Sequence, residues 1–320
     1  MKAVIGTTIA VVLLLAASIV SARDWPTRPV RILVGSAPGG MADSVAHAIA
    51  DQLGPMLKQP VFVENKPGRW NTLAAEATAK STNGHTLELG IGAAHTIVPH
   101  LLPLGYNGNR DLVPVVFVGD IPNVLVVSNG LHIDSLQKLI ELARQRPDQL
   151  GYASSGSGSV QHIAAEILQD VKGLSIRQSP CRGSGTALSG LAEGQVQMRF
   201  DTMPAVLEQI RNGTIRALAV TASQRSSLLP DVPTVAEAGA PDLEISAWYG
   251  IYMPASTPKS VQDTVHDTIS TVLKTPELIG RLRAIGAEIT PMTQLQFMAF
   301  HAARYQRYGN IIRKNHTRLD

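Results

Sequence analysis

Short apolar runs alternate with helical periodicity along almost the whole chain, and this alternation constrains the fold more than any other feature. Strands separated by helices typically form parallel sheets with crossover helices. We therefore expect an α/β fold with mainly parallel sheets. The expected strands are 30–34, 61–63, 86–89, 113–118, 124–127, 151–153, 197–200 and 217–220.

Three segments carry apolar residues at the spacing of a helix. The first covers residues 42–53, and Gly54-Pro55 is expected to end it. The second covers 136–143, with Asp134 or Ser135 as its cap, and the third covers 261–272 behind Thr257-Pro258. With no repeat and no long polar linker, the pattern favours two lobes between which the chain crosses more than once. In such folds ligands bind where the lobes meet, at the carboxyl ends of strands.

The N-terminus has the form of a secretory signal peptide. Lys2 is followed by an apolar stretch through Ala17 and by the small residues Val20-Ser21-Ala22, after which cleavage is expected. The apolar stretch is too short for a membrane span, so an uncleaved anchor is the weaker alternative. We therefore predict an exported protein.

Composition narrows the classes of partner. The formal net charge is +3 and aromatic residues make up 4% of the chain, which argues against a nucleic-acid binder. Cys181 is the one cysteine, so no intrachain disulfide can form and stability must come from buried cores.

Three glycine-rich turns each follow a strand and precede a helix: 36–40, 154–159 and 182–186. Such turns present backbone N–H groups at a helix N-terminus, where the partial positive charge favours an anion. The signatures of phosphate loops and dinucleotide folds are absent, so a carboxylate is the better ligand. The residues expected to contact it from these turns are Ala37, Pro38, Gly39, Gly40, Ser154, Ser155, Gly156, Ser159, Arg182 and Gly183.

Other polar and aromatic residues are weaker candidates. Asp201 ends a strand and either caps the next helix or accepts a hydrogen bond from a ligand. Trp70 stands in a polar loop with Asn71 and Thr72, and His162 follows the serine-glycine turn. Packing or a solvated surface role is the alternative for Trp70, His162 and Arg182.

Catalytic and metal-binding motifs are missing from the sequence. It contains no GxSxG, no HExxH and no histidines at metal-ligand spacing. A thiolate at Cys181 beside Arg182 remains an enzymatic alternative, but no partner base is identifiable. We expect no catalytic residue, no metal and no cofactor.

Several stretches resemble the substrate-binding components of tripartite tricarboxylate transporters, also called the Bug family. The resemblance covers the whole chain after the signal segment. The stretches that carry it are 25–30, 37–43, 63–68, 122–127, 152–158, 194–201, 215–221 and 229–239.

This resemblance implies a two-lobed type II periplasmic-binding-protein fold, the Venus flytrap, with each lobe a mainly parallel sheet flanked by helices. It implies a signal peptide at 1–22, lobe 1 from 23–123 and 224–320, and lobe 2 from 124–223. A periplasmic monomer would grip a small carboxylate between turns 37–40 and 154–159, with Arg182, Gly183 and Asp201 lining lobe 2. It would then deliver the ligand to two membrane subunits.

The sequence departs from the family pattern at the ligand loops. Arg69-Trp70-Asn71-Thr72 replaces a glycine-rich stretch, Cys181 replaces a tyrosine, and Val160 and Gln161 replace hydroxyl residues. We therefore expect an unusual ligand preference. The alternative hypothesis is a receptor of the same shape that passes its ligand-bound state to a signalling partner.

Overall fold

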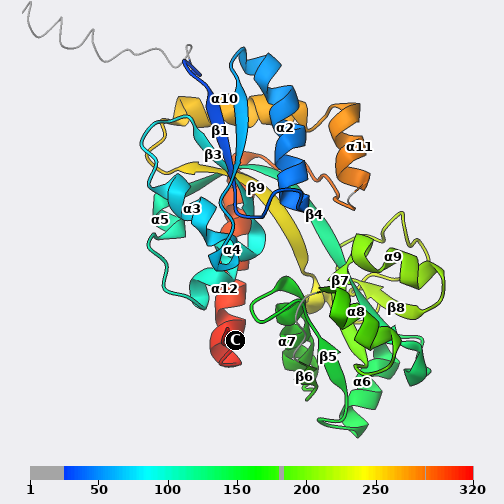
Figure 1. Ribbon diagram of the computed structural model, residues 1–320. Helices are drawn as coiled ribbons and strands as arrows, with labels where there is room; N and C mark the ends of the chain where they lie inside the picture. The colour runs from blue at the N-terminus through cyan, green and yellow to red at the C-terminus, as the bar shows by residue number, and fades with distance from the viewer. Residues whose placement is uncertain (1–24, 180–183, 285, 320) are drawn as a thin grey trace, which may run out of the picture.

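The computed structural model describes residues 25–179, 184–284 and 286–319. The expected cleavage site after Ala22 lies outside these residues. In Figure 1 two lobes lie one above the other, and long strands and one long helix run between them.

Lobe 1 is built on a five-stranded sheet with the order β2-β1-β3-β9-β4. β1 (Val30–Val34) is parallel to β2 (Val61–Asn65) and β3 (Thr86–Ile91), whereas β9 (Ser246–Pro254) is antiparallel to β3 and to the first half of β4 (Leu112–Ser128). The helices of this lobe are α2 (Met41–Leu57), α3 (Thr72–Ala79), α4 (Gly92–Thr96), α5 (Gly108–Asp111), α10 (Lys259–Val272) and α11 (Pro276–Ala284), with short 3-10 turns η2 (Arg69–Asn71) and η3 (Val98–His100).

Lobe 2 repeats this plan around the second half of β4. Its sheet contains β8 (Ile215–Val220), β4, β7 (Met198–Thr202), β5 (Gly151–Ala153) and β6 (Arg177–Ser179). β5 is parallel to β6 and β7, and β4 is antiparallel to β7 and β8. Its helices are α6 (Leu136–Gln145), α7 (Val160–Lys172), α8 (Ser184–Ala192) and α9 (Met203–Arg211), with 3-10 turns η4 (Asn129–Leu131) and η5 (Pro241–Leu243).

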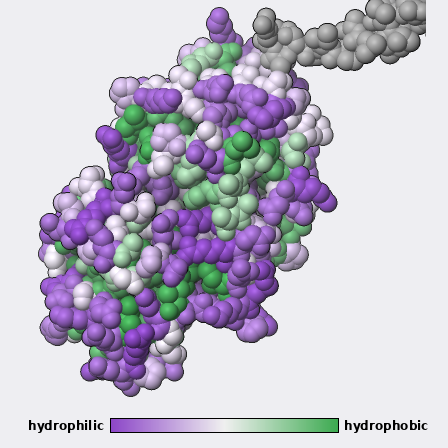
Figure 2. Space-filling model, turned by 180° about the vertical axis from the view of Figure 1, so that it is seen from behind, coloured by the Kyte–Doolittle hydropathy of each residue, from purple (hydrophilic) through white to green (hydrophobic). Residues whose placement is uncertain are grey.

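Apolar side chains cover both faces of each sheet, so each lobe has three layers. In lobe 1 one core joins the sheet to α2, α10 and α11, and an aromatic cluster with Phe117 and Trp248 fills the other face. In lobe 2 the cores lie under α6 and α7 on one face and under α8 and α9 on the other. In Figure 2 hydrophilic residues cover most of the face opposite to that of Figure 1, with only small apolar patches between them. No helix within the described ranges is long and apolar enough to cross a membrane.

Three segments join the lobes. β4 contributes to both sheets, and the chain returns into lobe 1 at β9. α12 (Gln294–Lys314) begins against lobe 1, where Phe297 joins the aromatic cluster, and ends in lobe 2, where Tyr308 and Ile312 belong to the core. Val235 and Leu243 also pack in the lobe 2 core. We therefore propose that lobe 2 extends to about residue 245, later than the expected boundary at 223.

All eight expected strands are present, but the sheets are mixed rather than mainly parallel. The antiparallel pairs arise where the chain crosses from one lobe to the other. Residues 112–128 form one continuous strand where two were expected, and its register shifts at Phe117–Gly119. The antiparallel pairs of the described sheets all involve β4 or β9, the two strands on which the chain crosses between the lobes.

One helix boundary differs from expectation, and one cap is confirmed. α2 continues through Gly54 and Pro55 to Leu57 and ends at Lys58, which is left-handed with a φ of 51° and donates its N–H to the carbonyls of Gly54 and Pro55. The proline lies in the last turn, so the helix continues for only two residues beyond it. Of the two caps proposed for α6, Ser135 takes the role, accepting the Lys138 N–H at 3.3 Å.

Candidate functional site

A cavity of about 290 Å³ lies where the two lobes face each other. Two segments line it. The lobe 1 wall is residues 69–72, which contributes Trp70 and Asn71, and the lobe 2 wall is residues 154–159, which contributes Ser155, Gly156, Ser157 and Ser159. The structure thus brings together five of the expected residues and adds Ser157. The described lining of the cavity contains no charged side chain.

The lobe 2 wall is an ordered turn at the start of α7. Gly156 and Gly158 have φ values of 122° and 77°, which favour glycine. The Ser159 hydroxyl caps α7 by accepting the His162 N–H at 3.2 Å, and the Ser154 hydroxyl accepts the Gly156 N–H at 3.2 Å. Ser154 is therefore buried inside the turn, whereas Ser155 is exposed and Ser159 is half-buried. The turn presents hydroxyls and backbone to the cavity.

A buried ion pair supports this turn from behind. The Arg199 side chain has no solvent exposure, and its Nε donates to Asp201 Oδ2 at 2.7 Å while its Nη2 lies 3.3 Å from the Ser155 hydroxyl. Asp201 also accepts the Thr202 N–H at 2.8 Å, so the carboxylate expected to meet a ligand is held by its own strand. Sequence reasoning missed Arg199. The available signal was its position two residues from Asp201, which places both side chains on one face of β7.

The lobe 1 wall is held in an unusual backbone conformation. Arg69, Trp70 and Asn71 have φ values of 46°, 54° and 67°, in the left-handed region that non-glycine residues rarely enter. Contacts on both sides enforce it. The Arg69 guanidinium donates to the Pro103 carbonyl at 3.0 Å, and the buried Thr72 hydroxyl donates to the Arg69 carbonyl at 2.8 Å. The result is an indole that is 46% exposed at the cavity.

The turn after β1 lies apart from the described lining of this cavity. Ala37, Pro38 and Gly39 are exposed, and Gly40 precedes α2 without a side-chain cap. Asp43 stabilises the turn by accepting the Gly39 N–H and the Asn65 amide, both at 2.8 Å. The turn is therefore rigid and open to solvent.

His162 faces away from the site. It is buried and lines a second cavity, of about 500 Å³, between α7, β6 and the end of α12. Its Nδ1 accepts the Gly158 N–H at 3.1 Å, and its Nε2 lies 3.4 Å from Glu166 Oε1. The expected residues Arg182 and Gly183, and Cys181 with them, lie outside the described residues.

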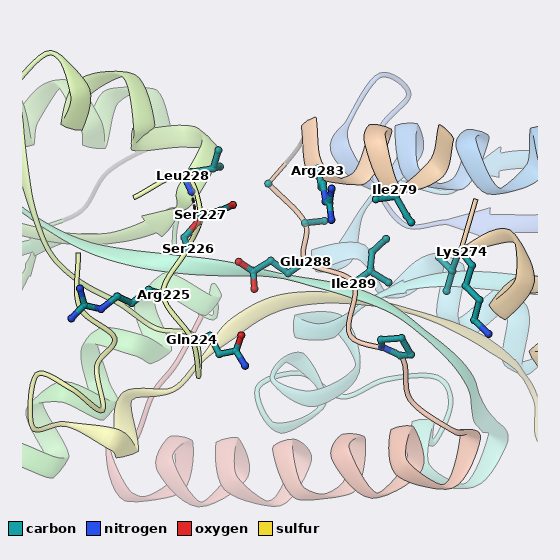
Figure 3. Close-up of a pocket in the computed structure, with 14 residues that line it drawn as sticks. Gln224, Arg225, Ser226, Ser227, Leu228, Lys274, Ile279, Arg283, Glu288 and Ile289 are labelled. Atoms are coloured by element: carbon teal, nitrogen blue, oxygen red, sulfur yellow. Dashed lines mark hydrogen bonds between the residues drawn. The ribbon is translucent and has the colours of Figure 1, made fainter. Parts of the chain in front are cut away.

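A larger cavity, of about 680 Å³, lies beside the crossing strands between residues 224–228 of lobe 2 and the segment from α11 to Pro291 in lobe 1. Figure 3 shows Ser226 and Leu228 on one side of it, Arg283 and Ile289 on the other, and Glu288 between them. None of the sequence-predicted ligand residues lines it. Size alone therefore does not mark the ligand site.

The crossing strands carry acidic groups with shifted pKa values. Burial raises the pKa of Asp120 to about 6, and the negative charge of Glu288 adds to this shift, while a hydrogen bond with Ser246 opposes it. Burial also raises the pKa of Glu288. Both residues line a small cavity of about 130 Å³ together with Glu244 and Arg304. Within the described ranges, no cluster of three or more histidine, cysteine or acidic residues could hold a metal ion.

Comparisons with known proteins identify the family. Residues 45–316 match the model of the tripartite tricarboxylate transporter family receptor. Protein BugT of Bordetella pertussis is 37% identical over 303 residues, which cover 94% of this chain and 93% of the relative.

Solved structures of similar proteins have the same fold. A protein of R. palustris determined with adipate has a TM-score of 0.75 and 32% identity, over 92% of this chain and 99% of the other. MatC from Rhodopseudomonas palustris with bound malate has a TM-score of 0.72 and 29% identity, over 90% of this chain and 100% of the other. They confirm the two-lobed periplasmic-binding-protein fold. The chain therefore belongs to the tripartite tricarboxylate transporter receptor family.

Proposed function

We propose that this receptor captures a small organic carboxylate in the 290 Å³ cavity between residues 69–72 and 154–159 and delivers it to the membrane subunits of a tripartite importer. The observation that carries the proposal is the lining of this cavity: hydroxyl and backbone groups on one lobe face an indole on the other. Neutral donors at a helix N-terminus stabilise an anion without a buried counter-charge. The relatives solved with adipate and with malate support the ligand class.

The two walls suit different parts of such a ligand. Ser155, Ser159 and the backbone at Gly156 supply polar contacts for a carboxylate, and Asn71 supplies an amide. The exposed indole of Trp70 suits the apolar body of the ligand. On closure of the lobes, the turn of Ala37–Gly40 at the start of α2 would add backbone donors from lobe 1, and Arg182 and Gly183 remain proposed ligand contacts of lobe 2.

The remaining expectations follow from family membership. We propose a monomer that is exported through cleavage after Ala22, acts in the periplasm and performs no catalysis. A sensory receptor with the same ligand is the alternative, and it predicts a gene neighbourhood without transporter subunits.

Titration of the full mature chain with adipate and malate tests the proposal. Trp70 is the exposed one of the three tryptophans, since Trp248 is buried and the indole of Trp25 donates to the Gly84 carbonyl at 2.8 Å. A saturable change in fluorescence that disappears in Trp70→Phe, with a rise in melting temperature, is the expected result. If neither acid changes either signal, and no small acid co-purifies in native mass spectrometry, the proposal is wrong.

A further inference from the structure

The chain after α12 folds back onto α7, the helix whose first turn forms the lobe 2 wall. Lys314 pairs with Asp170 on α7. The Thr317 N–H donates to the Ile312 carbonyl at 3.1 Å, which turns the chain toward the buried part of α7. The C-terminal residues therefore lie against lobe 2, although α12 starts in lobe 1.

Thr317 reaches a buried carboxylate. Its hydroxyl lies 2.7 Å from both carboxylate oxygens of Glu166, a residue that is only 9% exposed. A charge-assisted hydrogen bond of this kind compensates for removing a carboxylate from water. Glu166 Oε1 in turn lies 3.4 Å from Nε2 of His162, one helical turn earlier on α7.

His162 connects this carboxylate to the ligand turn. Because Nδ1 accepts the Gly158 N–H at 3.1 Å, the neutral ring must carry its proton on Nε2, which is the nitrogen that faces Glu166. Glu166 therefore favours the tautomer that holds the Gly158 peptide. A row of contacts runs from Thr317 through Glu166 and His162 to a peptide between two cavity-lining serines, Ser157 and Ser159.

A packing contact reinforces the same peptide. A Cβ atom built on Gly158 would lie 2.6 Å from Leu319 Cδ2 and 3.0 Å from Leu101 Cδ1. Leu319 thus covers Gly158 directly. Two independent contacts of the C-terminal residues, one polar and one apolar, converge on this glycine.

We infer that His162, Glu166 and Thr317 are positioning residues that fix the Gly158 peptide, and with it the hydroxyls of the lobe 2 wall, for ligand binding. The inference rests on the proposed function of that wall. α12 connects this segment to lobe 1: the side chain of its first residue, Gln294, donates to the Pro114 carbonyl at 3.1 Å, and Thr317 stands three residues after its last residue, Lys314.

Three variants of the full mature chain test the inference: Thr317→Val, Thr317→Ser and Lys314→Ala. Valine keeps the shape of threonine without the hydroxyl, serine restores the hydroxyl, and Lys314→Ala breaks the neighbouring ion pair with Asp170 but leaves Thr317 in place. The measurements are adipate affinity by calorimetry and the ¹⁵N–¹H chemical shift of the Gly158 amide.

Thr317→Val is expected to weaken adipate binding roughly three- to ten-fold, the equivalent of one hydrogen bond, and to shift the Gly158 amide. Thr317→Ser should restore both values, and Lys314→Ala should change neither. An unchanged Gly158 amide in Thr317→Val, or an equal loss of affinity in Lys314→Ala, overturns the inference. If the parent chain binds neither adipate nor malate, the proposed function fails, and the Gly158 shift alone decides whether the contacts position this peptide.

Discussion

The two walls of the cavity are held by opposite means. The lobe 2 wall, residues 154–159, rests on buried charge: Arg199 and Asp201 lie behind Ser155, and Glu166 and His162 lie behind Gly158. The lobe 1 wall, residues 69–72, is held by hydrogen bonds of Arg69 and Thr72 in a strained backbone, with three successive left-handed residues that present an exposed indole.

The comparison shows two ways to hold a residue in contact with a ligand. Buried polar groups stabilise the lobe 2 wall, whereas the lobe 1 wall keeps a strained backbone. The two solutions respond to mutation with opposite sign. Removing a supporting group from the lobe 2 wall should destabilise the protein, whereas relieving strain in the lobe 1 wall should stabilise it. In both cases ligand affinity should fall.

The largest effect is expected for Arg199→Met. Asp201 would remain as a buried carboxylate without its cation, which typically costs about 3–5 kcal/mol of the free energy of unfolding. Urea denaturation measures this loss, and Arg177→Met, at an exposed position on β6, is the control with a change within about 0.5 kcal/mol. The double variant Arg199→Met/Asp201→Leu should recover most of the stability. A small loss in the single variant would mean that the ion pair is not what holds this wall.

Asp120, a partly buried acid that shares a small cavity with Glu288 and Arg304, tests how burial of a charge affects stability. Burial, together with the nearby charge of Glu288, raises the pKa of Asp120 to about 6. Because the folded-state pKa lies above the usual value of 3.8, the folded protein binds the proton more tightly, and stability should fall as the pH rises from about 4 to 6.

Asp120→Asn should therefore stabilise the protein by about 2–3 kcal/mol at pH 8 and have little effect at pH 4. Melting temperatures measured across this pH range, with Asp231→Asn at an exposed position as control, give the result. An equal effect at both pH values would exclude the ionisation of Asp120 as the cause.

Much of the fold and part of the candidate site could be predicted from the sequence. The parallel strands and the serine-glycine turn at 154–159 were predictable because local pattern encodes them, and the expected residues Trp70 and Asn71 do lie opposite that turn. The supporting charges were not predictable in this way. A carboxylate at the end of a strand looks the same whether it faces a ligand or, like Asp201, an arginine on its own strand.

Two long elements were missed for a different reason. The buried residues Phe297, His301, Tyr308 and Ile312 of α12 have helical spacing, but His301 is polar, so the apolar stripe is broken. β9 contains Gly250, which usually weakens a strand. A Cβ at this position would lie 2.3 Å from the Phe297 ring, so the glycine allows α12 to pack against the sheet. Only this contact between α12 and the sheet explains why glycine stands within the strand.

A smaller effect is expected for Gly35→Ala, which tests the close approach of Gly35 to Asn71 in the lobe 1 wall. A Cβ atom on Gly35 would lie 2.4 Å from the Asn71 carbonyl oxygen, so one of the two backbones must move. Overpacking of this kind costs about 1–3 kcal/mol, and adipate affinity should fall as Asn71 is displaced. Gly280→Ala in α11 is the matched control, because nothing lies within 4 Å of its Cβ, and it should gain about 0.5–1 kcal/mol. Unchanged adipate affinity in Gly35→Ala would mean that the position of Asn71 does not matter for the ligand.

The smallest effect, and the one that separates the walls by sign, is expected for Trp70→Gly. Glycine adopts a φ of 54° without the strain of a side chain, and the indole is 46% exposed, so stability should rise by up to about 1 kcal/mol. Adipate binding should nevertheless weaken, because the apolar contact is lost. His132→Gly relieves the same strain at a φ of 53° at the C-cap of η4, outside the described lining of the cavity, and should stabilise the protein without changing adipate affinity. If Trp70→Gly instead destabilises the protein as Arg199→Met does, the indole supports the fold, and the two walls are not held by different means.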